Sequence, residues 1–564
     1  MINNILKQHK LLLLLILIIG AFLRFYNLNW GAPFYFHPDE RQNIANPILT
    51  SKSLFMLDQQ NFDTGTFPLL IIKIILSFLT SAFHNLLPLD QLQPVILISR
   101  IISAIISVGI LLLLFLAVRK IFNTAKACLT LAFATFSIGF IQFSHFGTIE
   151  LWEALFFLLL FFYSWRIAKY AHKVDGAICG ILFGFAVATK ISGIILVPAI
   201  LSSFFLFLYH QHLSRKNLLL NIKKVMAVFF LFIFSASIVF AATSLPLIIN
   251  FSTAISSIHF ESDVALGKIP VFYTRSFINT IPVVFQFTKI YPFLLNPLVT
   301  LLFIPSLFSV IFWGIKNRNC AYLLLATYYL LLFITQSFFF AKWTRYMIPT
   351  LPFIYIIIGV AIDDWLRNIK KRIDNTEIFT HVLVTYPIII SFIFAAAFFS
   401  IYLRPDVRIT ASNWIEKNFP ENSTILVESG NVIDIPLKGN FKIISLFFYN
   451  LETDTQTRSE IASGLEEADY FLIQSRRVFV NHQRLPDLYP KTARFYNALF
   501  DGKLGFEQIK ELHSYPMLQI GNWKLEIPDE KAEETWSVFD HPVIRVFKKN
   551  AQLTREGYVK FLEL

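Results

Sequence analysis

Eleven apolar stretches, several of them short for a membrane span, constrain what this chain can fold into. The two within 176–209 could instead form one long bent helix. A spanning helix needs about 20 predominantly apolar residues. Only 15% of the 564 residues are charged, whereas soluble chains usually carry about 25%. The pattern predicts a polytopic α-helical membrane protein and excludes a soluble enzyme, a disordered chain and a disulfide scaffold. The stretches lie near 10–28, 94–118, 126–143, 149–167, 176–190, 191–209, 224–246, 292–315, 321–340, 347–366 and 380–402.

The basic residues of the loops predict how these spans are oriented in a plasma membrane. Lys and Arg are retained on the cytoplasmic side. Placing every basic cluster inside puts the N-terminus in the cytoplasm and the chain beyond residue 404 outside, with a first outer loop at about 29–93. It also requires that the segment 67–83, interrupted by Lys73, lies along or dips into the outer interface without crossing. The clusters are Lys7/Lys10, Arg119/Lys120/Lys126, Arg166/Lys169/Lys173, Arg215/Lys216/Lys223/Lys224, Lys316/Arg318 and Arg367/Lys370/Lys371/Arg372.

The same loops account for the net charge of +12. Residues 405–564 hold 19 of the 49 Lys and Arg residues but 23 of the 37 Asp and Glu residues, so the positive excess lies entirely in the membrane half. Basic loops beside spanning helices have this simple cause. We therefore expect membrane lipids as partners and no nucleic acid.

Beyond residue 404 the chain changes to short strand patterns. Segments rich in β-branched and aromatic residues occur at 423–429, 442–449, 469–475 and 543–549, with helical patterns between them. Such alternation predicts an α/β domain with a partly parallel sheet. We therefore divide the chain into a transmembrane domain, 1–404, and an extracytoplasmic α/β domain, 405–564.

The sharpest chemical signal is His37-Pro38-Asp39-Glu40-Arg41, directly after the first span. Two adjacent carboxylates followed by a guanidinium offer a general base and a charge that tunes it. Ionisable groups at the depth of a membrane or at its surface tend toward function. The alternative is a polar loop that only has to meet water.

A second signal is the turn Ser144–Glu150 ahead of an apolar helix. Glu150 begins that helix, so its carboxylate either faces a polar cavity or is stabilised by the positive end of the helix dipole. His145 fits an interfacial histidine better than a metal ligand. Asp39, His145 and Glu150 could together hold one divalent ion, but the sequence contains no clear three-ligand motif.

Two cations and one further acid lie in other outer turns. Lys190 in ATKISG and Arg345 in AKWTRYMIP either snorkel to the interface or bind a lipid phosphate, with Arg as a bidentate fork and Lys as a point charge. Glu261 is an acid of the loop before the eighth stretch. The sequence has neither GxxxxGK[ST] nor a strand-linked GxGxxG, which disfavours a nucleotide-activated substrate.

Together these motifs resemble the C-type fold (GT-C) of glycosyltransferases that use polyprenyl-phosphate sugars, in particular the protein O-mannosyltransferase and aminoarabinose-transferase group. The resemblance covers about residues 10–400, and Glu150 stands where many relatives have Asp. It rests on Asp39-Glu40, FPLL at 67–70, Arg100, SHFGTIE at 144–150, GFAVATKISG at 184–193 and RYMIPTLPF at 345–353.

The resemblance implies an inverting transfer of a sugar from a polyprenyl-phosphate donor to an acceptor hydroxyl on the outer face. Asp39 would remove the proton from the acceptor. Arg41, Lys190 and Arg345 would stabilise the phosphate of the leaving group. The lipid tail would lie between helices that face the bilayer.

Four further residues receive supporting roles from the same resemblance. Glu40 and Glu150 would orient the acceptor or the sugar, or hold a divalent metal ion. His145 and Glu261 would contact substrate. The sugar and the acceptor, which is a protein, a lipid or a glycan, stay open.

Two other classes of function fit the composition. A transporter or flippase also needs many spans and buried charge, although such proteins often show internal repeats and this sequence shows none. A non-catalytic scaffold with an outer binding domain would tolerate replacement of both Asp39 and Glu40.

Overall fold

The computed structural model describes residues 2–51, 62, 64–82, 91–213, 218–373, 377–430 and 433–563. Arg215, Lys216 and part of the predicted first outer loop lie outside the described residues. The chain divides into two compact units. The first contains Met1–Leu28, Asp39–Ile269 and Asn279–Ala396, and the second contains Asn29–Pro38, Pro270–Ile278 and Ala397–Leu564.

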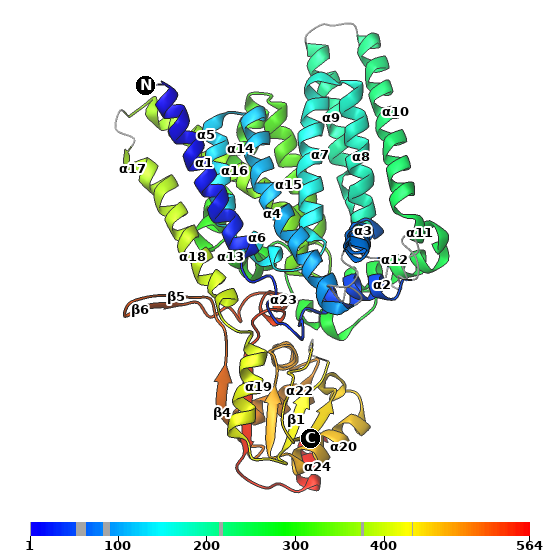
Figure 1. The fold of residues 1–564 in the computed structure, drawn as a ribbon, viewed down its shortest axis with the longest axis vertical. Coiled ribbons are helices and arrows are strands. Elements are labelled where there is room, and N and C mark those ends of the chain that lie inside the picture. The colour runs from blue at the N-terminus through cyan, green and yellow to red at the C-terminus, as the bar shows by residue number, and fades with distance from the viewer. Residues whose placement is uncertain are drawn as a thin grey trace. The chain divides into compact units, whose positions relative to one another are not determined.

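Long apolar helices form the first unit (Figure 1). Most of them run side by side, and their polar connections lie at the two ends of the bundle. They are α1 (Ile2–Phe25), α4 (Leu92–Ile121), α5 (Thr124–Thr135), α6 (Ile138–Ser144), α7 (Glu150–Tyr170), α8 (Lys173–Thr189), α9 (Val197–Leu213), α10 (Leu218–Thr243), α14 (Pro297–Lys316), α15 (Cys320–Ser337), α16 (Leu351–Lys370) and the greater part of α18 (Tyr386–Leu403).

Each of the eleven predicted spans corresponds to a helix or a helix pair. Among the described residues, eight helices are long and apolar enough to cross a membrane, and the bent pair α5–α6 makes a ninth. The other two are shorter: the apolar part of α1 is Leu13–Phe25, and α8 has 17 residues. A break at Lys190 separates α8 from the next helix, so 176–209 forms two helices. The prediction of a polytopic helical membrane protein is confirmed.

Arg24 accounts for the break between α5 and α6, which are bent by 58°. Its buried guanidinium donates to the carbonyl oxygens of Ala134 and Thr135 at 3.3 and 3.2 Å. The last carbonyls of a helix have no partner within the helix, so Arg24 satisfies those at the end of α5. The Ser137 hydroxyl then caps α6 by accepting from the backbone N–H of Phe140.

Three glycines on one face of α8 let this helix pack directly against α10. Gly176, Gly180 and Gly184 are spaced by four residues and therefore share a face. A Cβ on Gly180 would lie 2.2 Å from the carbonyl oxygen of Phe232, and one on Gly176 would lie 2.6 Å from that of Val228. Small residues allow such close approach between membrane helices.

Several short helices gather at one end of the bundle (Figure 1). Figure 1 shows α3 nearly end-on, so it runs across the long helices beside it. That the segment 67–83 does not cross the membrane stays a prediction, and residue 83 lies outside the described residues. The short helices are α2 (Asn46–Leu49), α3 (Thr66–Ala82), α11 (Leu245–Ile249) and α12 (Phe251–Ala265).

A five-stranded sheet of order β2-β1-β3-β7-β4 forms the centre of the second unit. The strand β1 pairs in parallel with β2 and β3, whereas β7 is antiparallel to β3 and β4. The four predicted strands and the partly parallel sheet are confirmed; β4 was not predicted. The strands are β1 (Thr424–Glu428), β2 (Lys442–Leu446), β3 (Tyr470–Ile473), β4 (Phe506–Leu512) and β7 (Ile544–Lys549).

Helices cover both faces of this sheet, as the alternation of strand side chains requires. Ile425 and Val427 of β1 pack with α19 (Val407–Asn418). Leu426, between them, faces the opposite core, which is built with the helices α20 (Thr455–Glu467), α22 (Pro490–Phe500) and α24 (Arg555–Glu563).

Two segments from the membrane half of the sequence belong to the second unit. In Asn29–Pro38, the ring of Phe36 lies 4.1 Å from the guanidinium of Arg408, and the ring of His37 lies 4.5 Å from that of Phe539. In Pro270–Ile278, Arg275 donates to the carbonyl oxygen of Tyr449 at 2.9 Å. The α/β unit is therefore built from three parts of the chain, not only from the residues that follow the last span.

The last turns of α18 are fastened to this unit by a buried polar cluster. Tyr402 donates a 2.9 Å hydrogen bond to Asp540. The His541 ring lies between Asp540 and Asp529, at 2.5 and 2.8 Å. Burial alone would lower the pKa of His541, but the two carboxylates outweigh it and raise the pKa to about 10. The imidazolium therefore persists at neutral pH.

The glycine face of α8 leads to a stability prediction. Gly180→Leu would push α8 away from α10 and lower the stability by about 1–3 kcal/mol or more, as overpacking does. Thermal unfolding of the purified protein in detergent would show a lower midpoint. Gly109→Leu in α4 is the matched control, because among the described residues nothing lies within 4 Å of a Cβ built there. Equal midpoints for both variants would contradict the packing argument.

Candidate active site

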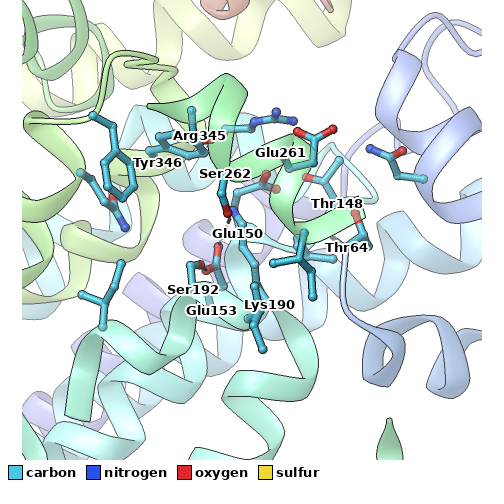
Figure 2. A pocket seen from close by; sticks show the side chains of 18 of the residues that line it. Thr64, Thr148, Glu150, Glu153, Lys190, Ser192, Glu261, Ser262, Arg345 and Tyr346 are labelled. Carbon is cyan, nitrogen blue, oxygen red and sulfur yellow. Dashed lines mark hydrogen bonds and ion pairs between the residues drawn. The ribbon is translucent and has the colours of Figure 1, made fainter. Parts of the chain in front are cut away.

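A cavity of about 400 Å³ opens within the first unit, among the turns predicted to face outward. Its lining includes residues of the first outer loop, of the turn before α7, of the break at Lys190, of α12 and of the segment around Arg345. Figure 2 shows Glu261 and Arg345 on one side of it, Glu153 and Lys190 on the other, and Glu150 between them. The polar lining residues are Asp39, Asn43, Thr64, Thr148, Glu150, Glu153, Lys190, Ser192, Glu261, Ser262, Gln336, Arg345 and Tyr346.

The ion pair of Asp39 and Arg345 lies at the cavity. Arg345 Nη1 donates to Asp39 Oδ2 at 2.6 Å, across 306 residues of chain. Asp39 directly precedes a π-helix, Glu40–Ala45, and Arg345 lies in the 3₁₀ segment Thr344–Thr350. Both side chains are about a quarter exposed, at 24% and 26%, so a ligand in the cavity can reach them.

Glu40, the neighbour of Asp39, points into the protein instead. Its carboxylate receives two hydrogen bonds from Arg100, at 2.7 and 2.6 Å, and one from the backbone N–H of Gly147 at 2.6 Å. Neither charged side chain is exposed. Arg100 also donates to the carbonyl oxygen of Leu28 at 2.8 Å. This cluster joins the first loop to α4 and to the turn before α7.

A second ion pair lies across the cavity. Lys190 Nζ is 3.5 Å from Glu153 Oε2, with 19% and 4% of the two side chains exposed. The Ser192 hydroxyl donates to the other oxygen of Glu153 at 3.4 Å. Lys190 also lies 5.1 Å from the centre of the Tyr346 ring. The backbone of Lys190 is extended between α8 and the 3₁₀ segment Ile191–Leu196, which turns its side chain away from the helix ladder.

Glu150 is, with Glu153, a buried acid of the cavity. Its side chain belongs to the first turn of α7 and the residue is 4% exposed. Among the described residues, none donates a hydrogen bond to its Oε2. The helix N-terminus favours a negative charge at this position. The oxygen without a partner belongs to a side chain that lines the cavity. Glu150 can therefore accept a hydrogen bond from a bound molecule.

The other predicted site residues are distributed differently. Glu261 of α12 lines the cavity. The ring nitrogens of His145 lie 2.8 and 2.9 Å from the carbonyl oxygens of Ile141 and Tyr26. His145, Glu40 and Arg41 are outside the cavity lining. Among the described residues, no group of three His, Cys, Asp or Glu side chains could hold a metal ion.

Sequence reasoning missed Glu153 and Ser192. Glu153 is three residues after Glu150, so both acids lie on one face of α7. A second acid in an otherwise apolar helix is the signal that could have found it. Ser192 follows Lys190 by two residues in a short irregular segment, and nothing in the sequence distinguishes it from other serines.

Much of the cavity lining is apolar. It consists largely of branched side chains, so the cavity combines apolar surface with paired charges. Such a lining can bind an amphipathic molecule that carries an anionic group. The apolar lining residues are Ile44, Ile149, Ile191, Ile194, Ile195, Ile258, Ala265, Leu266 and Phe339.

Comparison with known proteins agrees with this architecture. A family model described as dolichyl-phosphate-mannose-protein mannosyltransferase matches residues 73–240. The apo oligosaccharyltransferase of Archaeoglobus fulgidus is similar in fold, with a TM-score of 0.50 and 14% identity over 84% of this chain and 70% of that chain. The fold is that of the C-type glycosyltransferases.

Another similar structure is that of ArnT from Cupriavidus metallidurans bound to undecaprenyl phosphate. It has a TM-score of 0.44 and 13% identity over 83% of this chain and 92% of that chain. No curated protein sequence matches the chain. The family match and the fold confirm the resemblance predicted from the sequence, and they indicate a membrane glycosyltransferase with a lipid-linked donor.

The Glu40–Arg100 cluster of this C-type fold leads to a second stability prediction. Arg100→Met would leave Glu40 charged, buried and without its cation, which costs about 3–5 kcal/mol. We expect a marked fall in the thermal midpoint, and part of it should return in the double variant Arg100→Met/Glu40→Met. Arg119→Met, at the exposed end of the same helix, is the control. A wild-type midpoint for Arg100→Met would show that the ion pair is unimportant.

Proposed function

We propose that this chain moves a sugar from a polyprenyl-phosphate carrier to the hydroxyl group of an acceptor, with inversion, on the outer face of the plasma membrane. The observation that carries the proposal is the pairing of Asp39 with Arg345 at a cavity whose lining is largely apolar. One pair supplies both a proton acceptor and a phosphate-binding fork. The family description supports the class of donor, because dolichyl-phosphate-mannose is itself a polyprenyl-phosphate sugar.

The proposed reaction is a single displacement. The acceptor oxygen forms a bond to the anomeric carbon while the bond from that carbon to the phosphate oxygen breaks. The hydroxyl proton passes to the carboxylate of Asp39, and the electron pair of the broken bond stays on the phosphate. Attack from the side opposite the leaving group inverts the anomeric centre. General-base assistance of this kind contributes about 10²–10⁴ in rate.

Arg345 and Lys190 are proposed to stabilise the leaving group. The donor phosphodiester carries one negative charge and the released phosphomonoester carries two, so one new charge develops during transfer. Fixed cations that face a developing charge in a water-poor site lower the barrier. A donor phosphate would compete with Asp39 for the guanidinium of Arg345. The carboxylate would then be released from its partner when the donor is in place.

The remaining residues are assigned supporting roles in this proposal. Glu150 and Glu261 would accept hydrogen bonds from sugar hydroxyls, and the buried free oxygen of Glu150 supports this. Glu40 would act as a positioning residue, because it fixes the loop that carries Asp39. Arg41 and His145 stay candidates for substrate contact, although neither lines the cavity.

No metal ion enters the proposed mechanism. An Archaeoglobus fulgidus oligosaccharyltransferase structure is described as a complex with Zn and sulfate. In the part of this chain that the structure describes, the acids of the cavity form no metal-binding group. We therefore derive no step through a metal. If transfer in an assay required an added divalent ion, the metal-binding role that the sequence suggested for the acids would be supported instead.

The proposal makes Asp39 indispensable to transfer. Asp39→Asn removes the proton acceptor and should lower turnover by about 10²–10⁴. Proteoliposomes given polyprenyl-phosphate-[³H]mannose and a membrane extract as the source of acceptor would report labelled product. Asp263→Asn, which alters an acid outside the cavity lining, is the control. Near-normal labelling by a folded Asp39→Asn variant would remove the base assignment, and label that crosses the vesicle unattached would favour a flippase.

The donor phosphate should depend on Arg345 and Lys190. Undecaprenyl phosphate added to the detergent-solubilised protein should raise its thermal midpoint, and Arg345→Ala or Lys190→Ala should weaken this stabilisation about tenfold in apparent affinity, since one charge-assisted contact is lost. Lys268→Ala is the matched control, because Lys268 is an exposed cation outside the cavity lining. If all three variants respond alike, Arg345 and Lys190 do not bind the phosphate and only snorkel to the membrane interface.

A further inference from the structure

The second unit carries a separate β-hairpin with one apolar face. The strands β5 (Met517–Ile520) and β6 (Trp523–Glu526) pair only with each other in a two-stranded sheet. Ile520 is opposite Trp523 and Leu518 is opposite Leu525. Residues opposite each other, and residues two apart on a strand, share a face. One face is therefore entirely apolar.

The other face of this hairpin is polar apart from Met517. Gln519 is opposite Lys524, and Met517 is opposite Glu526. Lys524 Nζ lies 2.9 Å from Glu526 Oε2. The hairpin thus has the alternation of a sheet that is half buried, but the sheet has only two strands.

The apolar face lies open at its tip. Ile520 is 66% exposed and Trp523 is 53% exposed. An isolated two-stranded hairpin is at best marginally stable in water and needs a surface to bury its apolar side. Exposed apolar patches of this kind mark contact sites.

The base of the hairpin is attached to the end of a membrane span. The backbone N–H of Met517 donates to the Ser400 hydroxyl at 3.1 Å, and Arg404 donates to the carbonyl oxygen of Tyr515 at 2.6 Å. Ser400 lies in the last turn of α18, whose span ends at Leu403. Since a spanning helix ends at the bilayer surface, these bonds hold the hairpin at the level of the lipid head groups.

An exposed apolar side chain also lies at the end of α18. Leu403, the last residue of the candidate span, is itself 53% exposed.

We propose that the β5–β6 hairpin is an interfacial membrane anchor, with Leu518, Ile520, Trp523 and Leu525 turned into the lipid head-group region. Trp is the residue that proteins place at this depth, and Lys524 on the opposite face would stay in water. The anchor would fix the α/β unit at its junction with α18. This role is independent of the proposed transfer reaction.

Site-directed fluorescence on the full-length protein tests the anchor. The native cysteines Cys128, Cys179 and Cys320 are first replaced by alanine, and a single cysteine is introduced as Ile520→Cys or, on the polar face, as Gln519→Cys. Each variant is labelled with the environment-sensitive dye NBD and reconstituted in phosphatidylcholine/phosphatidylglycerol nanodiscs. The two positions are adjacent and both exposed, so labelling disturbs the fold equally little.

An anchor predicts opposite behaviour at the two positions. Brominated lipids should reduce NBD emission at 520 about twofold or more, as expected for a group inserted roughly 5–10 Å into the interface, and should leave emission at 519 nearly unchanged. Equal, weak quenching at both positions would overturn the proposal. Energy transfer between labelled copies, without quenching by lipid at 520, would also overturn it. A second copy of the chain would then cover the apolar face. A blue shift that requires added acceptor extract would identify an acceptor surface instead.

Discussion

The buried ion pair between Glu40 and Arg100 sets the geometry on which the rest of the candidate site depends. Two hydrogen bonds from the guanidinium of Arg100 and one from the backbone N–H of Gly147 hold the carboxylate of Glu40, which is not exposed to solvent. A carboxylate buried there has to be paired, because burying a charge without a partner is strongly destabilising. The loop after the first span is thereby tied to α4 and to the turn before α7, and that turn also lines the cavity. Asp39, one residue earlier, is left facing the opposite way.

Pairing explains the other charges of the cavity as well. Arg345 is paired with Asp39 and Lys190 with Glu153. Each pair has no net charge, and both cations are already held in place at the cavity. Side chains that already form ion pairs need no large rearrangement to accept an anionic group, because an incoming phosphate exchanges one carboxylate for another anion. Glu150 differs from both pairs, since one of its oxygens has no hydrogen-bond partner within the described chain. The cavity therefore contains two ion pairs together with one carboxylate oxygen that has no hydrogen-bond partner among the described residues.

Hydropathy was sufficient to predict the helices of the bundle, because every span in a bilayer has to satisfy its backbone internally and bury a long apolar surface. The strands β1, β2, β3 and β7 could be predicted because they are rich in β-branched and aromatic residues. The strand β4, Phe506–Leu512, escaped detection because it lies at a sheet edge and its apolar residues are three apart, with polar and charged residues between them. The hairpin β5–β6 escaped because each strand has only four residues.

The pairings of the candidate site could not be predicted from the sequence, although most of its members could. Composition marks Asp39 and Arg345 as charges beside apolar helices, but 306 residues separate them, and no local pattern says which acid meets which cation. The same limit applied to Glu40, whose neighbour Asp39 carries an identical functional group. Only the third dimension shows that one carboxylate of the doublet is structural and its neighbour faces the cavity.

The division of the chain into units gives Asp39 a special position. The segment Asn29–Pro38 packs with the α/β unit through Phe36 and His37, and the next residue begins the longest part of the bundle unit. The proposed base is thus one peptide bond from a segment that packs with the α/β unit, and its own neighbour Glu40 is held by the bundle. A backbone fixed on both sides of a residue has little conformational freedom left to lose when that residue reacts, which is the condition for a preorganised base. Asp39 therefore lies at the point where the chain passes from the segment of the α/β unit into the bundle unit.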